Sequence, residues 1–139
     1  MPDNEMCLTF FALSRNESFA RMAAAGFAAQ LNPTLVELTD LKTAVSEAVT
    51  NAIIHGYEGK GGMVRLSCII DDRTVTVEVS DDGCGIADIA QAMEALYTSK
   101  PEEERSGMGF TVMETFMDAV QVYSALGTGT RVVMKKRFV

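Results

Sequence analysis

The 139-residue sequence lacks any apolar run of the roughly 18 residues that suggest a membrane span. Its amino terminus carries Asp3 and Glu5, where a secretory signal peptide has positive charge ahead of an apolar segment. The three cysteines (Cys7, Cys68 and Cys84) lie far apart and form no C-x-x-C pair of the kind that holds zinc. We therefore expect a cytoplasmic protein whose thiols stay reduced.

Basic residues are also scarce, with 12 Lys and Arg against 19 Asp and Glu, which gives a net charge of −7. Affinity for the phosphate backbone of nucleic acid depends on clustered Lys and Arg. The charge therefore argues against nucleic acid as a direct partner. The run Lys135-Lys136-Arg137 leaves a local basic patch open, although the solvated end of a strand explains it more simply.

The chain length and the hydrophobic fraction of 47% are typical of a globular protein with its own core. We expect a single domain over residues 1–139. Apolar residues alternate loosely in 6–13 and more regularly in 64–70 and 75–79, which predicts strands. Two closing strands are expected at 120–125 and 130–138, joined by a glycine-containing turn.

Helical spacing of apolar residues marks the segments between these strands. A first amphipathic helix is expected from Phe19 and Met22 to Leu31, ending at Asn32-Pro33. Thr34 and Glu37 form a capping box that starts a second helix. The apolar stripe of this second helix is Leu38, Leu41, Val45, Ala48 and Ala52, and Gly56 ends it. With short helices at 88–96 and 110–117, the pattern predicts an α+β fold, a two-layer α/β sandwich with helices packed on one face of a mainly antiparallel sheet.

The second helix carries polar residues opposite its apolar stripe. Glu47, Asn51 and His55 follow each other at intervals of four and so share one face. The amide oxygen of Asn51 is a hard ligand that suits Mg²⁺, and Glu47 is placed to act as a general base. Alone, a Glu and an Asn on a helix face are usually solvated surface residues.

The segment Asp81-Asp82-Gly83-Cys84-Gly85-Ile86 directly follows a predicted strand. Its glycines let the backbone turn sharply and approach a flat ligand closely. The Asp81 carboxylate can accept a hydrogen bond from an exocyclic amine such as that of adenine. By itself, D-x-G-x-G is also a common surface turn.

Two further glycine motifs follow. The segment 105–110 has the sequence R-S-G-M-G-F and leads into a predicted helix, where backbone amides can form an anion site. Gly129-Thr130 begins the last predicted strand, and a hairpin turn explains this motif equally well. Neither motif is specific alone.

In this order, the four motifs resemble those of the GHKL ATPase superfamily, which includes DNA gyrase, heat-shock chaperones, MutL and histidine kinases. The match spans nearly the whole chain. Three segments, E-A-V-T-N-A-I-I-H-G-Y at 47–57, 98–110 with its T-S-K-P start, and N-E-S-F-A-R at 16–21, are similar to the anti-sigma F factor family of spore-forming bacteria. Asp82 and Cys84 depart from that family, but both occupy variable positions of the motif.

The resemblance implies a GHKL (Bergerat) ATP-binding fold and two activities. A protein of this family binds a sporulation sigma factor, sigma F, and blocks its access to RNA polymerase. It also acts as an ATP- and Mg²⁺-dependent serine/threonine-protein kinase that phosphorylates a serine of its anti-anti-sigma factor. A homodimer formed through the sheet or the first strand is implied as well.

The resemblance also assigns roles to individual residues. Glu47 would accept the serine proton, Arg105 would neutralise charge on the transferring phosphoryl group, and Asn51 would hold Mg²⁺. Asp81 would hold the adenine amine with support from Thr130, and Arg21 would contact the sigma factor. A lid is expected at about 96–109. The remaining candidate ATP contacts are Gly83, Gly85, Ile86, Thr98, Lys100, Ser106, Gly107, Met108 and Gly109.

Three other interpretations are open. A stress-response anti-sigma kinase of the RsbW type shares the motifs, with a poorer match in the lid. A non-catalytic, ATP-dependent clamp on a sigma factor is a second alternative, which Glu47 disfavours. The catalytic half of a histidine kinase is the third; the sequence shows no helix pair with a phosphoacceptor histidine, and its one histidine, His55, ends the helix of the ATP site.

Overall fold

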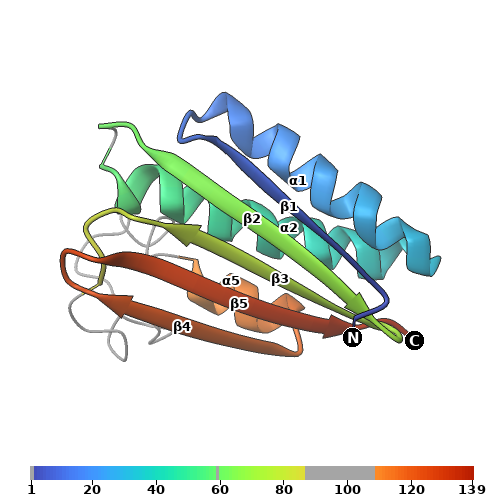
Figure 1. Cartoon of the computed structure of the whole chain (residues 1–139). Coiled ribbons are helices and arrows are strands. Elements are labelled where there is room, and N and C mark those ends of the chain that lie inside the picture. The colour runs from blue at the N-terminus through green and yellow to red at the C-terminus, as the bar shows by residue number, and fades with distance from the viewer. Residues whose placement is uncertain (1, 59, 87–108) are drawn as a thin grey trace.

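The computed structural model describes residues 2–58, 60–86 and 109–139. In this part of the chain, five strands form one sheet in the order β1-β2-β3-β5-β4, with every neighbouring pair antiparallel. Helices α1, α2 and α5 cover one face of it (Figure 1). The elements are β1 (Asn4–Phe11), α1 (Arg15–Ala28), η1 (Ala29–Leu31), α2 (Leu35–Asn51), η2 (Ala52–Gly56), β2 (Met63–Asp71), β3 (Thr74–Asp81), α5 (Phe110–Phe116), β4 (Ala119–Ala125) and β5 (Gly129–Arg137). The predicted α+β sandwich is confirmed.

The β2–β3 hairpin forms the centre of the sheet and follows the predicted alternation. It turns at Asp72, whose φ of 55° is left-handed, and its register pairs Leu66 with Val79. Alternate side chains of both strands face the helices and are buried, as expected from the sequence. These side chains are Val64, Leu66, Cys68, Ile70, Val75, Val77 and Val79.

Helix α2 begins with the predicted capping box. The Glu37 N–H donates to Thr34 Oγ1 at 3.1 Å, and the Thr34 N–H donates to Glu37 Oε1 at 2.9 Å. The α-helix ends at Asn51, and the last turn, Ala52–Gly56, is a π-helix. The helical path therefore stops at Gly56 as predicted, but with a widened final turn of the kind often found at functional sites.

Helix α1 corrects one prediction. Its buried residues are alanines at positions 20, 24, 25 and 28, whereas Phe19 and Met22 are 55% and 62% exposed. Small side chains let α1 approach α2 closely, so the alanine face packs inward and the bulky residues of the first turns face solvent. Among the bulky apolar residues of the predicted first helix, only Phe27 and Leu31, near its far end, pack against the core.

The remaining elements differ from expectation mainly at their ends. β1 ends at Phe11 rather than at residue 13, because the Leu13 N–H donates to the Phe11 carbonyl in a turn. The expected helix at 88–96 and most of the expected lid lie outside the described residues. Among the helices that the structure describes, none has both the length and the apolarity needed to cross a bilayer.

Candidate functional site

A hollow lies at one end of the sheet, between the end of α2, the first residue of α5 and strands β3 and β5. Its lining brings together candidate residues that are far apart in the sequence. Asn51 comes from α2, Asp81 from the end of β3, and Thr130 from the start of β5. The other lining residues are Ala48, Ala52, His55, Gly56, Val79, Gly85, Ile86, Phe110 and Val132. The hollow thus combines apolar walls with a few convergent polar groups.

Among the residues that the structure describes, Asp81 is the only charged one that is buried, with 6% of its surface exposed. Its Oδ1 accepts the Gly83 N–H at 2.9 Å. Burial raises the pKa of Asp81, and hydrogen bonds from the backbone of Gly83 and Thr130 partly oppose this effect. The carboxylate lies directly over Gly56, where an added Cβ would be 2.7 Å from the carboxyl carbon and from Oδ1. Glycine at position 56 therefore makes room for the Asp81 side chain.

The loop after β3 is fastened to the end of η2. The Cys84 N–H donates to the Gly56 carbonyl at 2.7 Å, and a Cβ on Gly83 would collide with that carbonyl. The Tyr57 hydroxyl accepts the Asp82 N–H at 2.8 Å and donates to the Met63 carbonyl at 2.6 Å. In the sequence, Tyr57 stands out only as the last residue of the family-like segment 47–57, and nothing local shows its contact with Asp82, 25 positions away.

Ser124 is a second residue that the motifs do not reveal. It lies on β4, and its hydroxyl contacts the Ile86 N–H, the Gly129 carbonyl and the Thr130 hydroxyl. It therefore connects the loop after β3 to the start of β5. The predicted residues Ile86 and Thr130 are positioned partly by a neighbour that no sequence signal marks.

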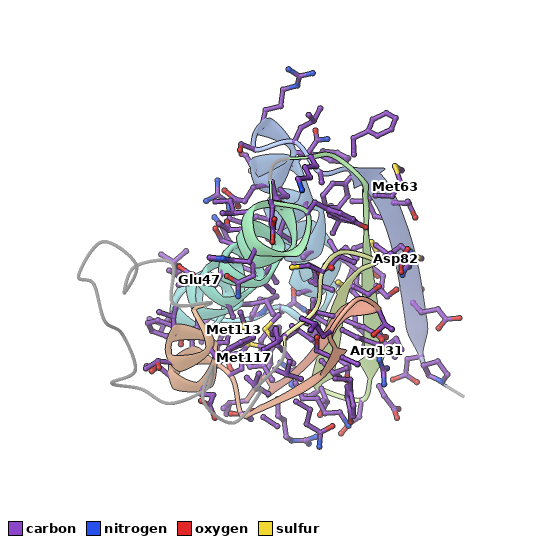
Figure 2. All side chains as sticks on the ribbon, turned by 90° about the vertical axis from the view of Figure 1, so that its left-hand side faces the viewer. Glu47, Met63, Asp82, Met113, Met117 and Arg131 are labelled. Carbon is purple, nitrogen blue, oxygen red and sulfur yellow. The ribbon has the colours of Figure 1, made fainter. Side chains whose placement is uncertain are left out.

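Glu47 lies beside this hollow rather than in its wall. Gly109, the N-cap of α5, has a φ of 61°, and a Cβ there would collide with Glu47 Oε2. Figure 2 shows Glu47 on the side of the molecule where Met113 and Met117 also lie, away from Asp82 and Arg131. Burial, and then the negative charge of Glu17, raises the pKa of Glu47.

Arg21 lies on α1 and does not line the hollow described above. It lines a separate surface depression between α1 and α2, together with Glu47 and other residues of α2. Its Nε is 3.7 Å from Glu17 Oε2, and its Nη2 donates to Ser18 Oγ at 3.3 Å. The side chain keeps 34% of its surface exposed, next to the exposed Met22.

The other candidate residues cannot be placed in this way. Thr98, Lys100, Arg105, Ser106, Gly107 and Met108 lie outside the described residues. Within the described ranges, no group of three or more His, Cys, Asp or Glu side chains is arranged to hold a metal. Cys68 is buried, and burial raises its pKa to about 12, whereas Cys7 and Cys84 are exposed.

Comparison with known proteins extends this description. The family of histidine kinase-like ATPase domains matches residues 11–136. The anti-sigma F factor of Clostridium acetobutylicum is 61% identical over 138 residues, covering 99% of this chain and 96% of the relative. The anti-sigma F factor of Clostridium beijerinckii is 60% identical over 139 residues, covering 99% and 97%.

A solved structure supports the fold. The RsbU and RsbW domains of a Mycobacterium tuberculosis protein align with a TM-score of 0.66 and 21% identity over 99% of this chain. This chain spans 32% of that longer chain. At this level of identity the likeness concerns the fold alone.

Proposed function

This chain belongs to the anti-sigma F factor family and carries a histidine kinase-like ATPase domain, and we propose that it is an ATP-dependent anti-sigma factor and protein serine kinase. It would hold a sporulation sigma factor away from RNA polymerase and phosphorylate a serine of the matching anti-anti-sigma factor. The observation that carries the proposal is the buried Asp81 carboxylate over Gly56, in one hollow with Asn51 and Thr130. The cytoplasm is the proposed location.

The side chains that line the hollow have the chemistry that recognition of an adenine nucleotide requires. Asp81 presents a buried acceptor for the adenine amine, while Val79, Ile86 and Val132 supply apolar surface for a flat ring. The amide oxygen of Asn51 is a suitable donor for Mg²⁺, which takes few protein ligands and completes its shell with phosphates and water. When bound, Mg²⁺ would neutralise part of the phosphate charge.

The proposed reaction transfers one phosphoryl group. The serine oxygen of the partner attacks the γ-phosphorus, the bond to the oxygen bridging the β- and γ-phosphates breaks, and ADP leaves. Glu47 would take the serine proton. Burial raises the pKa of Glu47, which makes its carboxylate a stronger base. A general base typically increases the reaction rate by a factor of about 10²–10⁴. Arg105 remains the candidate for neutralising charge on the transferring group.

Two features support the proposed protein partners. Helix α1 exposes the apolar side chains Phe19 and Met22 as well as the charged Arg21, and residues of these kinds occur in protein interfaces. β1 is an edge strand of the sheet, so its outer side can pair with a second strand. The latter supports a homodimer formed through the first strand.

The kinase and the non-catalytic clamp differ in their dependence on Glu47. Glu47→Gln keeps the size of the side chain but removes the base. We expect phosphate transfer to the anti-anti-sigma factor to fall by about 10²-fold or more, with ATP affinity nearly unchanged. Asn51→Ala should instead weaken Mg²⁺-ATP binding itself. Glu114→Gln, an exposed carboxylate on α5, is the matched control and should transfer phosphate at the parental rate.

The outcomes separate the alternatives. Parental transfer by Glu47→Gln would place the base elsewhere. If the parent protein transfers no phosphate yet retains a sigma factor, the clamp interpretation is correct. If millimolar Mg²⁺-ATP causes no rise in melting temperature, nucleotide binding itself is refuted.

The sigma-factor surface has its own test. Arg21→Glu should weaken sigma binding and leave ATP affinity unchanged, because the side chain lies on α1 away from the hollow. Arg15→Glu introduces the same change of charge elsewhere on α1 and serves as the control. Equal sigma affinity in both variants would make Arg21 an ordinary surface charge.

A further inference from the structure

The hydroxyl of Ser124 makes three short contacts, two of them with the lining residues Ile86 and Thr130. It accepts the Ile86 N–H at 2.8 Å, lies 2.9 Å from the Gly129 carbonyl oxygen, and lies 2.8 Å from Thr130 Oγ1. All three contacts are partly buried. The three partners come from the loop after β3 and from the start of β5, so one side chain on β4 joins two parts of the site.

Counting protons fixes the direction of each bond. A serine hydroxyl has one proton, and a carbonyl oxygen has none. The Gly129 carbonyl can therefore interact favourably at 2.9 Å only if Ser124 donates to it. With that proton used, the short contact between the Ser124 and Thr130 hydroxyls requires a proton from Thr130. The reverse assignment would leave two acceptor oxygens facing each other.

The orientation of the Thr130 hydroxyl matters for the hollow, because Thr130 lines it together with Asp81. Because the Thr130 proton points back toward Ser124, the hydroxyl has only lone pairs left for a ligand. The ionised Asp81 carboxylate is likewise an acceptor only. This part of the wall therefore offers two acceptors and suits a ligand group that carries two N–H donors.

We propose that Ser124 is a positioning residue for nucleotide selectivity: it holds the Thr130 hydroxyl as an acceptor, and so favours 6-aminopurine over 6-oxopurine nucleotides. The amine of adenine supplies the donors that the wall requires, whereas a 6-oxo group would place a third acceptor against Thr130 and Asp81. The inference rests on the proposed ATP site and adds a residue that controls which purine it accepts.

The test compares affinities for ATP and inosine triphosphate, which carries oxygen in place of the 6-amine. Ser124→Ala frees the Thr130 hydroxyl to rotate and donate. We expect the preference for ATP over inosine triphosphate to fall about 3- to 10-fold, the range of one neutral hydrogen bond. Thr130→Val, which removes the hydroxyl, should lower the preference by a similar factor.

A double-mutant cycle separates this role from general support of the loop. In the Thr130→Val background, Ser124→Ala should leave the preference unchanged, because the hydroxyl through which it acts is gone. An equal loss of preference in both backgrounds would mean that Ser124 acts through Ile86 or Gly129, and would overturn the proposal. Ser124→Thr keeps a hydroxyl and should retain the parental preference.

Other outcomes are equally informative. Should Ser124→Ala fail to fold, Thr130→Val alone decides, since an unchanged preference in that variant refutes the proposal. If the parent binds ATP but Ser124→Ala keeps the full preference, this inference fails while the proposed function stands. If the parent binds neither nucleotide, the proposed function fails first.

Discussion

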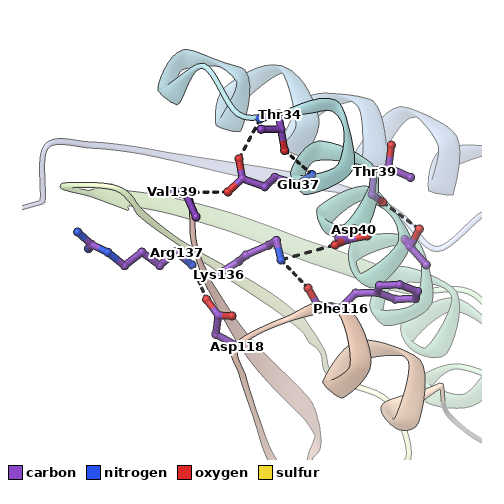
Figure 3. Close-up of polar contacts among 10 residues, drawn as sticks. Thr34, Glu37, Thr39, Asp40, Phe116, Asp118, Lys136, Arg137 and Val139 are labelled. Carbon is purple, nitrogen blue, oxygen red and sulfur yellow. Dashed lines mark hydrogen bonds and ion pairs between the residues drawn. The ribbon is translucent and has the colours of Figure 1, made fainter.

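The two ends of the sandwich treat their carboxylates in opposite ways. At the start of α2, Glu37 accepts hydrogen bonds from the Thr34 N–H at 2.9 Å and the Val139 N–H at 2.8 Å (Figure 3). These backbone donors lower its pKa. At the other end of α2, burial raises the pKa of both Glu47 and Asp81. One end stabilises its negative charge, and the other disfavours it.

Other charges at the start of α2 are also compensated. Lys136 Nζ donates to the Phe116 carbonyl at 2.9 Å and lies 3.8 Å from Asp40 Oδ2, while the Arg137 N–H donates to Asp118 Oδ2 at 2.6 Å (Figure 3). Lysine near the last carbonyls of a helix also interacts favourably with the helix dipole. We call this network the closed end. Its residues are Thr34, Glu37, Asp40, Phe116, Asp118, Lys136, Arg137 and Val139.

The two ends therefore contribute differently to the free energy of folding. The closed end satisfies its polar groups within the chain and so contributes to folding. The hollow contains the buried Asp81 carboxylate, and the partly desolvated Glu47 carboxylate lies beside it; both cost stability but suit ligand binding and proton transfer. Substitutions at the two ends should therefore separate stability from nucleotide affinity.

The largest effect is expected at Gly56. Gly56→Ala places a methyl group 2.7 Å from the carboxyl carbon of Asp81 and forces that side chain to move. We expect ATP affinity to fall about 100-fold, as for loss of a hydrogen bond to a charged group. The free energy of unfolding should fall by about 1–3 kcal/mol from overpacking. Calorimetric titration and thermal denaturation measure the two effects.

Gly26→Ala is the matched control, because a Cβ on Gly26 meets no atom within 4 Å. Within α1, alanine should raise the free energy of unfolding by about 0.5–1 kcal/mol and leave ATP affinity as it was. Nearly parental ATP affinity in Gly56→Ala would show that the position of Asp81 does not control binding.

Asp81→Asn is a gentler change at the same place. The amide keeps the size of the side chain but offers one oxygen where the carboxylate has two, so ATP affinity should fall about 10-fold with the fold intact. Titration with ATP, after a circular dichroism check of folding, tests this expectation. A variant that binds ATP as well as the parent would remove Asp81 from the adenine site.

The closed end should show the opposite behaviour. Thr34→Ala removes the oxygen that accepts the Glu37 N–H and should lower the free energy of unfolding by about 1 kcal/mol. ATP affinity should stay within about twofold of the parent, whereas Thr34→Ser should restore the stability. A loss of ATP affinity in Thr34→Ala would mean that the two ends are coupled along α2.

Features set by neighbouring residues could be predicted from the sequence. The capping box at Thr34 and Glu37 and the alternation of β2 and β3 depend on local geometry, and the structure confirms both. The buried face of α1 could not be derived in this way. Hydrophobicity pointed to Phe19 and Met22, but the close approach of α2 favours alanines.

The same distinction applies to the site. Asn51, Asp81 and Thr130 belong to motifs, and the structure brings them to one hollow. Gly56 was expected only to end a helix, yet it also makes room for Asp81. The sequence gives no role to Tyr57 or Ser124, because both act through contacts with distant segments. Tertiary contacts of this kind are not visible in a single sequence.

The smallest effect, and the most direct test of the comparison, is the pH dependence of stability. Glu47 has a pKa above its ordinary value of 4.5, so the native state binds more protons than the unfolded state as pH rises above 4.5. Its ionisation therefore lowers the free energy of unfolding through that window. Glu47→Gln avoids this cost and should raise the melting temperature at pH 7 by roughly 1–3 °C, a modest figure because solvent screens the charge.

Glu37 has a lowered pKa, and so the sign reverses. Its stabilising effect is complete above the ordinary value of 4.5 and disappears as pH falls through the lowered pKa. Glu37→Gln should therefore lower the melting temperature at pH 7. The difference for Glu47→Gln should shrink as pH falls from the raised pKa toward 4.5, whereas the difference for Glu37→Gln should persist down to 4.5 and shrink below it. Thermal scans of both variants and the parent from pH 7 to pH 4 test these opposite signs. A lower melting temperature for Glu47→Gln than for the parent at pH 7 would mean that the Glu47 carboxylate stabilises the fold, as the Glu37 carboxylate does.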